Sequence, residues 1–149
     1  MIDVSTQQPS SSPPAPDTVA EVMRPALTTV EPDAHLAAAA YLMKHAGASA
    51  LVILDDDQGK RPIGLITKTD IVDAVADGQD VNDVRIRDLM TSDLTFCTTT
   101  TSIRTAAQSM LAGRIRHLPV LHHGELVGMV DIGDLARPSL QVDGPSRRP

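Results

Sequence analysis

The sequence GLITKTD at residues 64–70 returns in altered form as GMVDIGD at residues 128–134. Before these two phrases, matching residues of the two copies lie a constant 67 positions apart, as Met23 and Met90 do. At the glycines and final acids of the two phrases the offset falls to 64 positions, so the second copy has a polar turn three residues shorter. Connecting turns tolerate such length changes. The sequence therefore predicts an internal repeat, and the repeat decides the fold.

Each copy has the pattern of a β-α-β-β-α unit. In the first copy we expect a strand, a helix, two strands and a second helix, in that order, at residues 27–30, 34–45, 50–54, 62–66 and 68–76. The apolar residues of the first helix share one face, Pro32-Asp33 is typical of its start, and Gly47 is typical of its end. A unit of about sixty residues buries too little of its sheet alone, so the two copies are expected to pack face to face.

The expected fold class is α/β (α+β), with two β-α-β-β-α motifs packed as a pseudo-twofold pair, at residues 18–80 and 81–140. Residues 1–17 are rich in Ser, Pro and Gln, and residues 141–149 are similarly poor in apolar side chains. Such segments bury too little surface to offset the entropy lost on ordering. Both are expected to be disordered tails.

Composition limits the partners and the compartment. The 149 residues carry a net charge of −6 and only 1% aromatic residues, which argues against nucleic acid. Cys97, the single cysteine, cannot form an internal disulfide and is expected to be a small buried thiol in a reducing compartment. No apolar run is long enough to span a bilayer, and no basic segment precedes an apolar one at the N-terminus. We expect a cytoplasmic protein with no membrane partner.

Together the repeated segments resemble a tandem pair of CBS (cystathionine β-synthase type) motifs, in the form of a stand-alone Bateman module. The resemblance covers residues 18–140. It rests on the two glycine-to-acid phrases and on three further segments, VAEVM at 19–23, IRDLM at 86–90 and RHLPVL at 116–121. The first copy departs from the pattern at Val52, where the second copy keeps a proline, Pro119.

The resemblance implies a regulatory pair that commonly forms a homodimer and has two clefts between its motifs. Such clefts often bind AMP, ADP, ATP or S-adenosylmethionine, and no cofactor is required. The nucleotide-binding residues implied for the first cleft are Gly64, Thr67, Asp70, Thr95, Ile115, Arg116 and His117. For the second, weaker cleft they are Thr28, Ala48, Ser49, Ala50, Asp131 and Asp134.

Thr67 and Asp70 have two interpretations. As a capping box they only satisfy free N–H groups at a helix start, and Asp131 with Asp134 fits that pattern too. As ligands, the Asp70 carboxylate accepts both hydroxyls of a ribose, and Thr67 at the helix N-terminus contacts phosphate. The planar guanidinium of Arg116 suits phosphate, but Arg116 is equally consistent with a surface arginine at the end of a strand. His117 is as consistent with packing or capping as with ligand binding.

The second cleft differs because Asp131 would place a negative charge beside a phosphate. The matching stretch of the first copy offers no arginine. A carboxylate repels a nearby phosphate unless a cation intervenes. We therefore expect this cleft to be empty, or to take an uncharged or cationic adenosyl ligand.

Three functions compete. The first is a nucleotide sensor that acts in trans on an unknown effector protein, and the second is a ligand-free dimeric interaction or structural protein. The third, an enzyme, is not expected, because no triad order, nucleophile elbow or Walker loop is present. No metal is expected either, since residues 55–57 (DDD) and His122-His123 fit solvated turns. The small residues 37–40 suit close helix packing in the core or at a dimer seam.

Overall fold

The computed structural model of the chain describes residues 16–25, 28–55 and 61–143. The turn expected at 56–60 and most of the expected N-terminal tail lie outside these residues. The last helix runs to Asp143, into the segment expected as a C-terminal tail. None of the described helices is long and apolar enough to cross a membrane.

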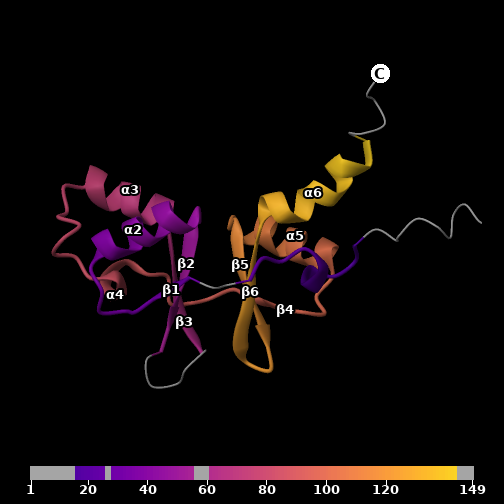
Figure 1. Cartoon of the computed structure of the whole chain (residues 1–149), viewed down its shortest axis with the longest axis horizontal. Coiled ribbons are helices and arrows are strands. Elements are labelled where there is room, and N and C mark those ends of the chain that lie inside the picture. Colours follow the sequence, from indigo (N-terminus) through magenta and orange to yellow (C-terminus); the bar gives the residue numbers. More distant parts are fainter. Residues whose placement is uncertain (1–15, 26–27, 56–60, 144–149) are drawn as a thin grey trace, which may run out of the picture.

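Both copies have the expected β-α-β-β-α order, which confirms the fold class. The first copy contains β1 (Thr29–Val30), α2 (Leu36–Ala46), β2 (Ala50–Leu54), β3 (Pro62–Thr67) and α3 (Lys68–Ala76). The second contains β4 (Cys97–Thr98), α5 (Ile103–Gly113), β5 (His117–His122), β6 (Glu125–Asp131) and α6 (Ile132–Asp143). A short helix precedes each copy, η1 (Val19–Glu21) and α4 (Ile86–Leu89). In Figure 1 the copies lie side by side, with β2 and β5 near the centre and the helices toward the outside.

The two sheets have the same topology. In the first, β1 pairs parallel to β2 and β2 antiparallel to β3, and β4, β5 and β6 repeat this order. Central strand β2 is buried on both faces. Leu51 and Ile53 belong to the core under α2, whereas Val52 packs with Leu121 and Leu126 of the second sheet. Burial on both faces explains why β2 is an unbroken apolar run.

The helix bounds match the expectations closely except at the start of α2. α3 spans the expected residues, and Gly47 ends α2 in the left-handed region at φ 66°. Helix α2 begins at Leu36 rather than at residue 34. Residues 34 and 35 instead pair with the segment before the second copy: the Ala34 carbonyl accepts from the Ile86 amide at 2.9 Å, and His35 pairs with Arg85. The Asp33 carboxylate accepts a hydrogen bond from Arg87 Nε at 2.6 Å and does not cap the helix.

The segment before each copy packs against the other copy. We call residues 18–25 and 85–92 the first and second leader segments. Val19 of the first leader is fully buried in the core of the second copy, and Ile86 of the second leader is fully buried in the core of the first. This exchange joins the two copies into one folding unit, because each core is completed by the other copy's leader.

The glycine of each repeated phrase lies where a leader crosses a strand. A Cβ on Gly128 would lie 2.6 Å from the Met23 sulfur, and one on Gly64 would lie 2.5 Å from the Met90 sulfur. Main-chain hydrogen bonds join each leader to the same strand, between Arg24 and Met129 in one case. The absence of a side chain at these glycines is what permits the close approach.

Candidate functional site

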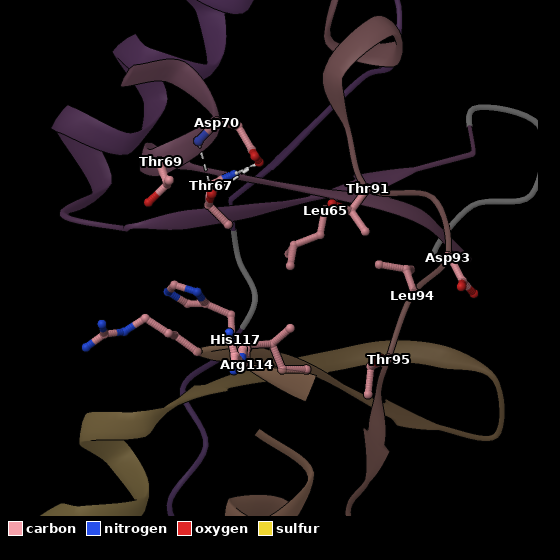
Figure 2. A pocket seen from close by; sticks show the side chains of 12 residues that line it. Leu65, Thr67, Thr69, Asp70, Thr91, Asp93, Leu94, Thr95, Arg114 and His117 are labelled. Carbon is pink, nitrogen blue, oxygen red and sulfur yellow. Dashed lines mark hydrogen bonds between the residues drawn. The ribbon is translucent and has the colours of Figure 1, made fainter. Parts of the chain in front are cut away.

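A cavity of about 280 Å³ lies between the two copies at the start of α3. Figure 2 shows Thr67 and Asp70 on one side of it, with His117, Arg114 and Thr95 on the other. Its lining residues are Leu65, Thr67, Thr69, Asp70, Thr91, Asp93, Leu94, Thr95, Arg114, Ile115, Arg116 and His117. Six of the seven residues predicted for the first cleft are thus brought together. Gly64 does not line the cavity and instead faces Met90.

Thr67 and Asp70 form the capping box that the sequence suggested. The Asp70 amide donates to Thr67 Oγ1 at 3.3 Å, and the Thr67 amide donates to Asp70 Oδ2 at 2.8 Å. The Thr67 hydroxyl also donates to Asp70 Oδ2, at 3.1 Å. Every one of these bonds to the carboxylate uses Oδ2. Capping therefore leaves Asp70 Oδ1 with lone pairs for a ligand hydroxyl, so the cap and a ligand role are chemically compatible.

The opposite wall of the first cleft supplies cations and one histidine. Arg114 and Arg116 both line it and are exposed. Sequence reasoning missed Arg114, although the offset of 67 pairs it with Gly47. Arg114 ends α5 with φ 54°, in the same left-handed region that Gly47 adopts at the end of α2. This conformation is uncommon for a residue with a side chain.

His117 connects the two clefts. Its Nε2 is 2.8 Å from Ser49 Oγ of the first copy, in a hydrogen bond across the interface. Burial is the largest effect on His117 and lowers its pKa, and the charge of Arg116 lowers it further. The carboxylates of Asp131 and Asp134 oppose this shift, but the pKa stays below its ordinary value. His117 is therefore neutral at pH 7, and one ring nitrogen donates while the other accepts.

The second cleft is a cavity of about 340 Å³ lined by all six residues predicted for it. The full lining is Arg24, Pro25, Thr28, Ala46, Gly47, Ala48, Ser49, Ala50, Leu51, Val52, His117, Met129, Asp131 and Asp134. An arginine in this cleft was not predicted from the sequence, yet the structure places one there. The matching stretch of the first copy has none, but Arg24 arrives from the first leader segment, which packs on the second copy.

Arg24 is paired with both acids of the second phrase. Its Nε donates to Asp134 Oδ1 at 2.9 Å, and its Nη2 lies 3.6 Å from Asp131 Oδ2. Arg137 Nη1 donates to the same Asp134 oxygen at 3.2 Å. The bond to Asp134, reinforced by its charge, raises the pKa of Arg24 further. The acids of the second cleft are thus neutralised within the protein.

A central cavity of about 430 Å³ joins the two clefts and shares residues with each. It lies between the N-termini of α3 and α6, where the positive ends of the two helix dipoles favour anions. Three of its lining side chains, those of Arg24, Lys68 and Arg116, are positively charged, and one, that of Asp131, is acidic. The full lining is Arg24, Ser49, Thr67, Lys68, Thr69, Arg116, His117, Asp131, Ile132 and Gly133.

Other reactive side chains lie apart from the clefts. Among the described residues, no three His, Cys, Asp or Glu side chains gather as a metal site would require. His122 contacts the ring of His123 and the hydroxyl of Thr99. Cys97 is buried, and burial raises the pKa of its thiol to about 11. An unreactive thiol of this kind is a packing residue.

A model of the CBS domain matches residues 19–77 and 86–140 of this chain. The chain therefore belongs to the CBS domain family, as the repeated segments indicated. An uncharacterized 17.7 kDa protein of Acidianus ambivalens is 36% identical over 125 residues, which cover 83% of this chain and 74% of that protein.

Three solved structures of similar proteins share the fold at TM-scores of 0.70 to 0.76. A CBS domain protein of Pyrobaculum aerophilum complexed with AMP has a TM-score of 0.76 and is 26% identical, covering 84% of this chain and 97% of that one. Hypoxic Response Protein I with two coordinated zinc ions has a TM-score of 0.70 and 30% identity, covering 80% and 97%. A hexameric CBS-CP12 protein from bloom-forming cyanobacteria has a TM-score of 0.76 and 26% identity, covering 86% and 74%. The chain is thus a regulatory CBS pair in its architecture.

Proposed function

We propose that this chain senses an adenosine nucleotide, which binds in the first cleft, and passes the signal in trans to an effector protein. The observation that carries the proposal is the placement of Asp70 Oδ1. It belongs to a half-buried carboxylate at the mouth of a cavity built from both copies, and the capping bonds do not use it. An acceptor of this kind suits the two hydroxyls of a ribose.

The rest of the first cleft suits the rest of a nucleotide. The N-terminus of α3 and the side chain of Arg116 form an anion site next to Thr67. Leu65, Leu94 and Ile115 give the same cavity an apolar wall for a base. The AMP complex of the Pyrobaculum aerophilum protein supports AMP as the first ligand to test. Binding in a cleft between the copies would reach both of them, which is what a sensor requires.

A second candidate function is a ligand-free interaction protein, possible because the capping box is complete without any ligand. Large apolar side chains are exposed on the helices of the first copy, with Tyr41 at 62%, Val72 at 63% and Val75 at 58%. Such side chains suit self-association or a protein partner, and the hexameric relative supports self-association. On this reading the chain forms a homodimer, and no nucleotide changes its stability.

A thermal-shift panel with AMP, ADP, ATP, S-adenosylmethionine and GTP separates the two functions. A ligand at about a hundred times its dissociation constant adds roughly 2.7 kcal/mol to the free energy of unfolding. For a chain of this size the midpoint should rise by about 5–10 °C. The sensor predicts such a rise with one adenosine ligand and its loss in Asp70→Ala.

Ser102→Ala is the matched control, because it removes a helix cap outside the clefts. The Ser102 side chain accepts the Thr105 amide at the start of α5, as Thr67 accepts the Asp70 amide. Losing a cap of either kind costs about 1 kcal/mol. Ser102→Ala should therefore melt lower than the wild type yet keep the full nucleotide response. The absence of a response to any ligand up to about 5 mM in the folded wild type would favour the interaction protein.

A further inference from the structure

The two phrases place equivalent carboxylates at equivalent helix starts, yet only one carboxylate is accessible. Asp70 is half-buried, with Oδ1 outside the capping bonds. Asp134 is 1% exposed and accepts from three donors. The Asp131 amide donates to its Oδ2 at 2.9 Å, while Arg24 and Arg137 donate to its Oδ1 at 2.9 and 3.2 Å. No ribose can reach Asp134 without displacing Arg24.

The main chain fixes Arg24 in this place. Its amide donates to the Met129 carbonyl and its carbonyl accepts from the Met129 amide, both at 2.9 Å. The neighbouring Met23 packs over Gly128. The guanidinium therefore starts from an anchored backbone, beside both carboxylates of the second phrase.

The first cleft has the same backbone arrangement without the cation. At the offset of 67, the counterpart of Arg24 is Thr91, whose amide and carbonyl bond to Leu65 in the same way, at 2.9 and 3.0 Å. Threonine has neither the length nor the charge to pair with Asp70. Two differences thus distinguish the occupied Asp134 carboxylate from the open Asp70 carboxylate: Arg24 against Thr91, and Arg137 against Asp73 at the offset of 64. Arg24 makes the shorter of the two bonds to Asp134 and is the one that also reaches Asp131.

We infer that Arg24 occupies the ribose acceptor of the second cleft, so that the chain binds one adenosine nucleotide and binds it in the first cleft. This inference rests on the proposed function, and it makes Arg24 the residue that sets the number of nucleotides. A nucleotide in the second cleft must give up the charged hydrogen bond to Asp134. Bonds of this strength correspond to a loss of about tenfold to a hundredfold in affinity.

Isothermal titration with AMP tests the inference by its stoichiometry. We expect one AMP per chain in the wild type and two in Arg24→Met, which keeps a stem of similar length and removes the guanidinium. Adding Asp134→Asn to Arg24→Met should abolish the second site and keep the first. Arg104→Met is the control, since Arg104 is an exposed arginine on α5 outside every cleft described above and the change removes the same charge. It should bind one AMP.

The outcomes separate this inference from the proposed function. Two AMP molecules in the wild type, or one in the wild type and still one in folded Arg24→Met, overturn the role of Arg24 and leave the sensor intact. One AMP in Arg24→Met with none in the wild type supports the role of Arg24 and overturns the first cleft as the nucleotide site. No AMP in either protein overturns both proposals.

Amide chemical shifts of the wild type provide a second test that needs no variant, in case Arg24→Met does not fold. At saturating AMP, we expect the amides of Thr67, Asp70 and Thr95 to shift. The amides of Asp131 and Asp134, which hold the second cap, should not move. Shifts of equal size at the two caps would refute the inference.

Discussion

Replacing Gly128 with alanine drives a methyl group into the leader segment that crosses β6. The new Cβ would lie 2.6 Å from the Met23 sulfur and 2.9 Å from the carbonyl oxygen of Arg24. The thioether can rotate away, because methionine is flexible. The Arg24 carbonyl cannot move as easily, since it accepts a hydrogen bond from the Met129 amide. Relief of the clash must therefore shift the main chain of the leader.

Gly64→Ala in the first copy is the matched comparison. There the Cβ would lie 2.5 Å from the Met90 sulfur, but 3.3 Å from the nearest main-chain oxygen, that of Thr91. Overpacking costs about 1–3 kcal/mol, while replacing glycine recovers about 0.4–1 kcal/mol by restricting the unfolded chain. We expect a loss of about 2 kcal/mol for Gly128→Ala and about 1 kcal/mol or less for Gly64→Ala. These losses lower the melting midpoint by about 4–8 °C and about 2–4 °C.

The free energy of unfolding in urea measures the difference, and a double-mutant cycle with Met23→Ala locates its origin. Removing the Met23 thioether from the wild type leaves a gap, but in Gly128→Ala it makes room for the new methyl group. The two changes should therefore couple favourably, by about 1 kcal/mol. Equal losses in Gly128→Ala and Gly64→Ala, or strict additivity with Met23→Ala, would refute the exchange of leaders between copies.

Two further predictions concern titratable groups. Since burial lowers the pKa of His117 below its ordinary value of 6.5, its contribution to stability is present at neutral pH and is lost as the pH falls below 6.5. Between about pH 7.5 and about pH 5, the free energy of unfolding in urea should fall less in His117→Gln than in the wild type. His45→Gln, a control at an exposed position, should match the wild type. Since burial raises the pKa of Cys97 to about 11, iodoacetamide at about pH 8 should label it slowly in the folded protein and rapidly in urea; fast labelling of the folded protein would contradict its burial.

The parts of the fold that follow from local pattern were predictable from the sequence. The offset between copies identified the pair, and the bounds of β2 and α3 follow from an apolar run and a capping box. The start of α2 was wrong by two residues, because residues 33–35 pair with residues 85–87 of the second leader. A contact across 54 positions leaves no local signal in the sequence.

The site was predictable as far as the repeat extends. Residues at matching positions of the two copies converge at the clefts, as expected for a pseudo-twofold pair. Gly64 was assigned to the ligand, whereas in the structure it faces Met90 from the exchanged leader. Arg24 was missed for the same reason, since the sequence gives no sign that residues 18–25 pack on the second copy. The spacing of the apolar residues in this segment is compatible with packing into the core of either copy.

The geometry of the second cleft suggests a different reason for its expected weakness from the one that the sequence suggested. Asp131 was expected to repel phosphate, and such repulsion acts through space and weakens as salt screens the charges. In the structure Arg24 pairs with both Asp131 and Asp134, so the acids carry little uncompensated charge toward a ligand. On this geometry, a nucleotide that enters the second cleft must replace Arg24 as the hydrogen-bond partner of Asp134. Because Asp134 is 1% exposed but the Arg24 side chain is 55% exposed, salt screens that pair in part, less than it screens two surface charges. Occupancy by Arg24, rather than repulsion by Asp131, is therefore the cause that fits this geometry.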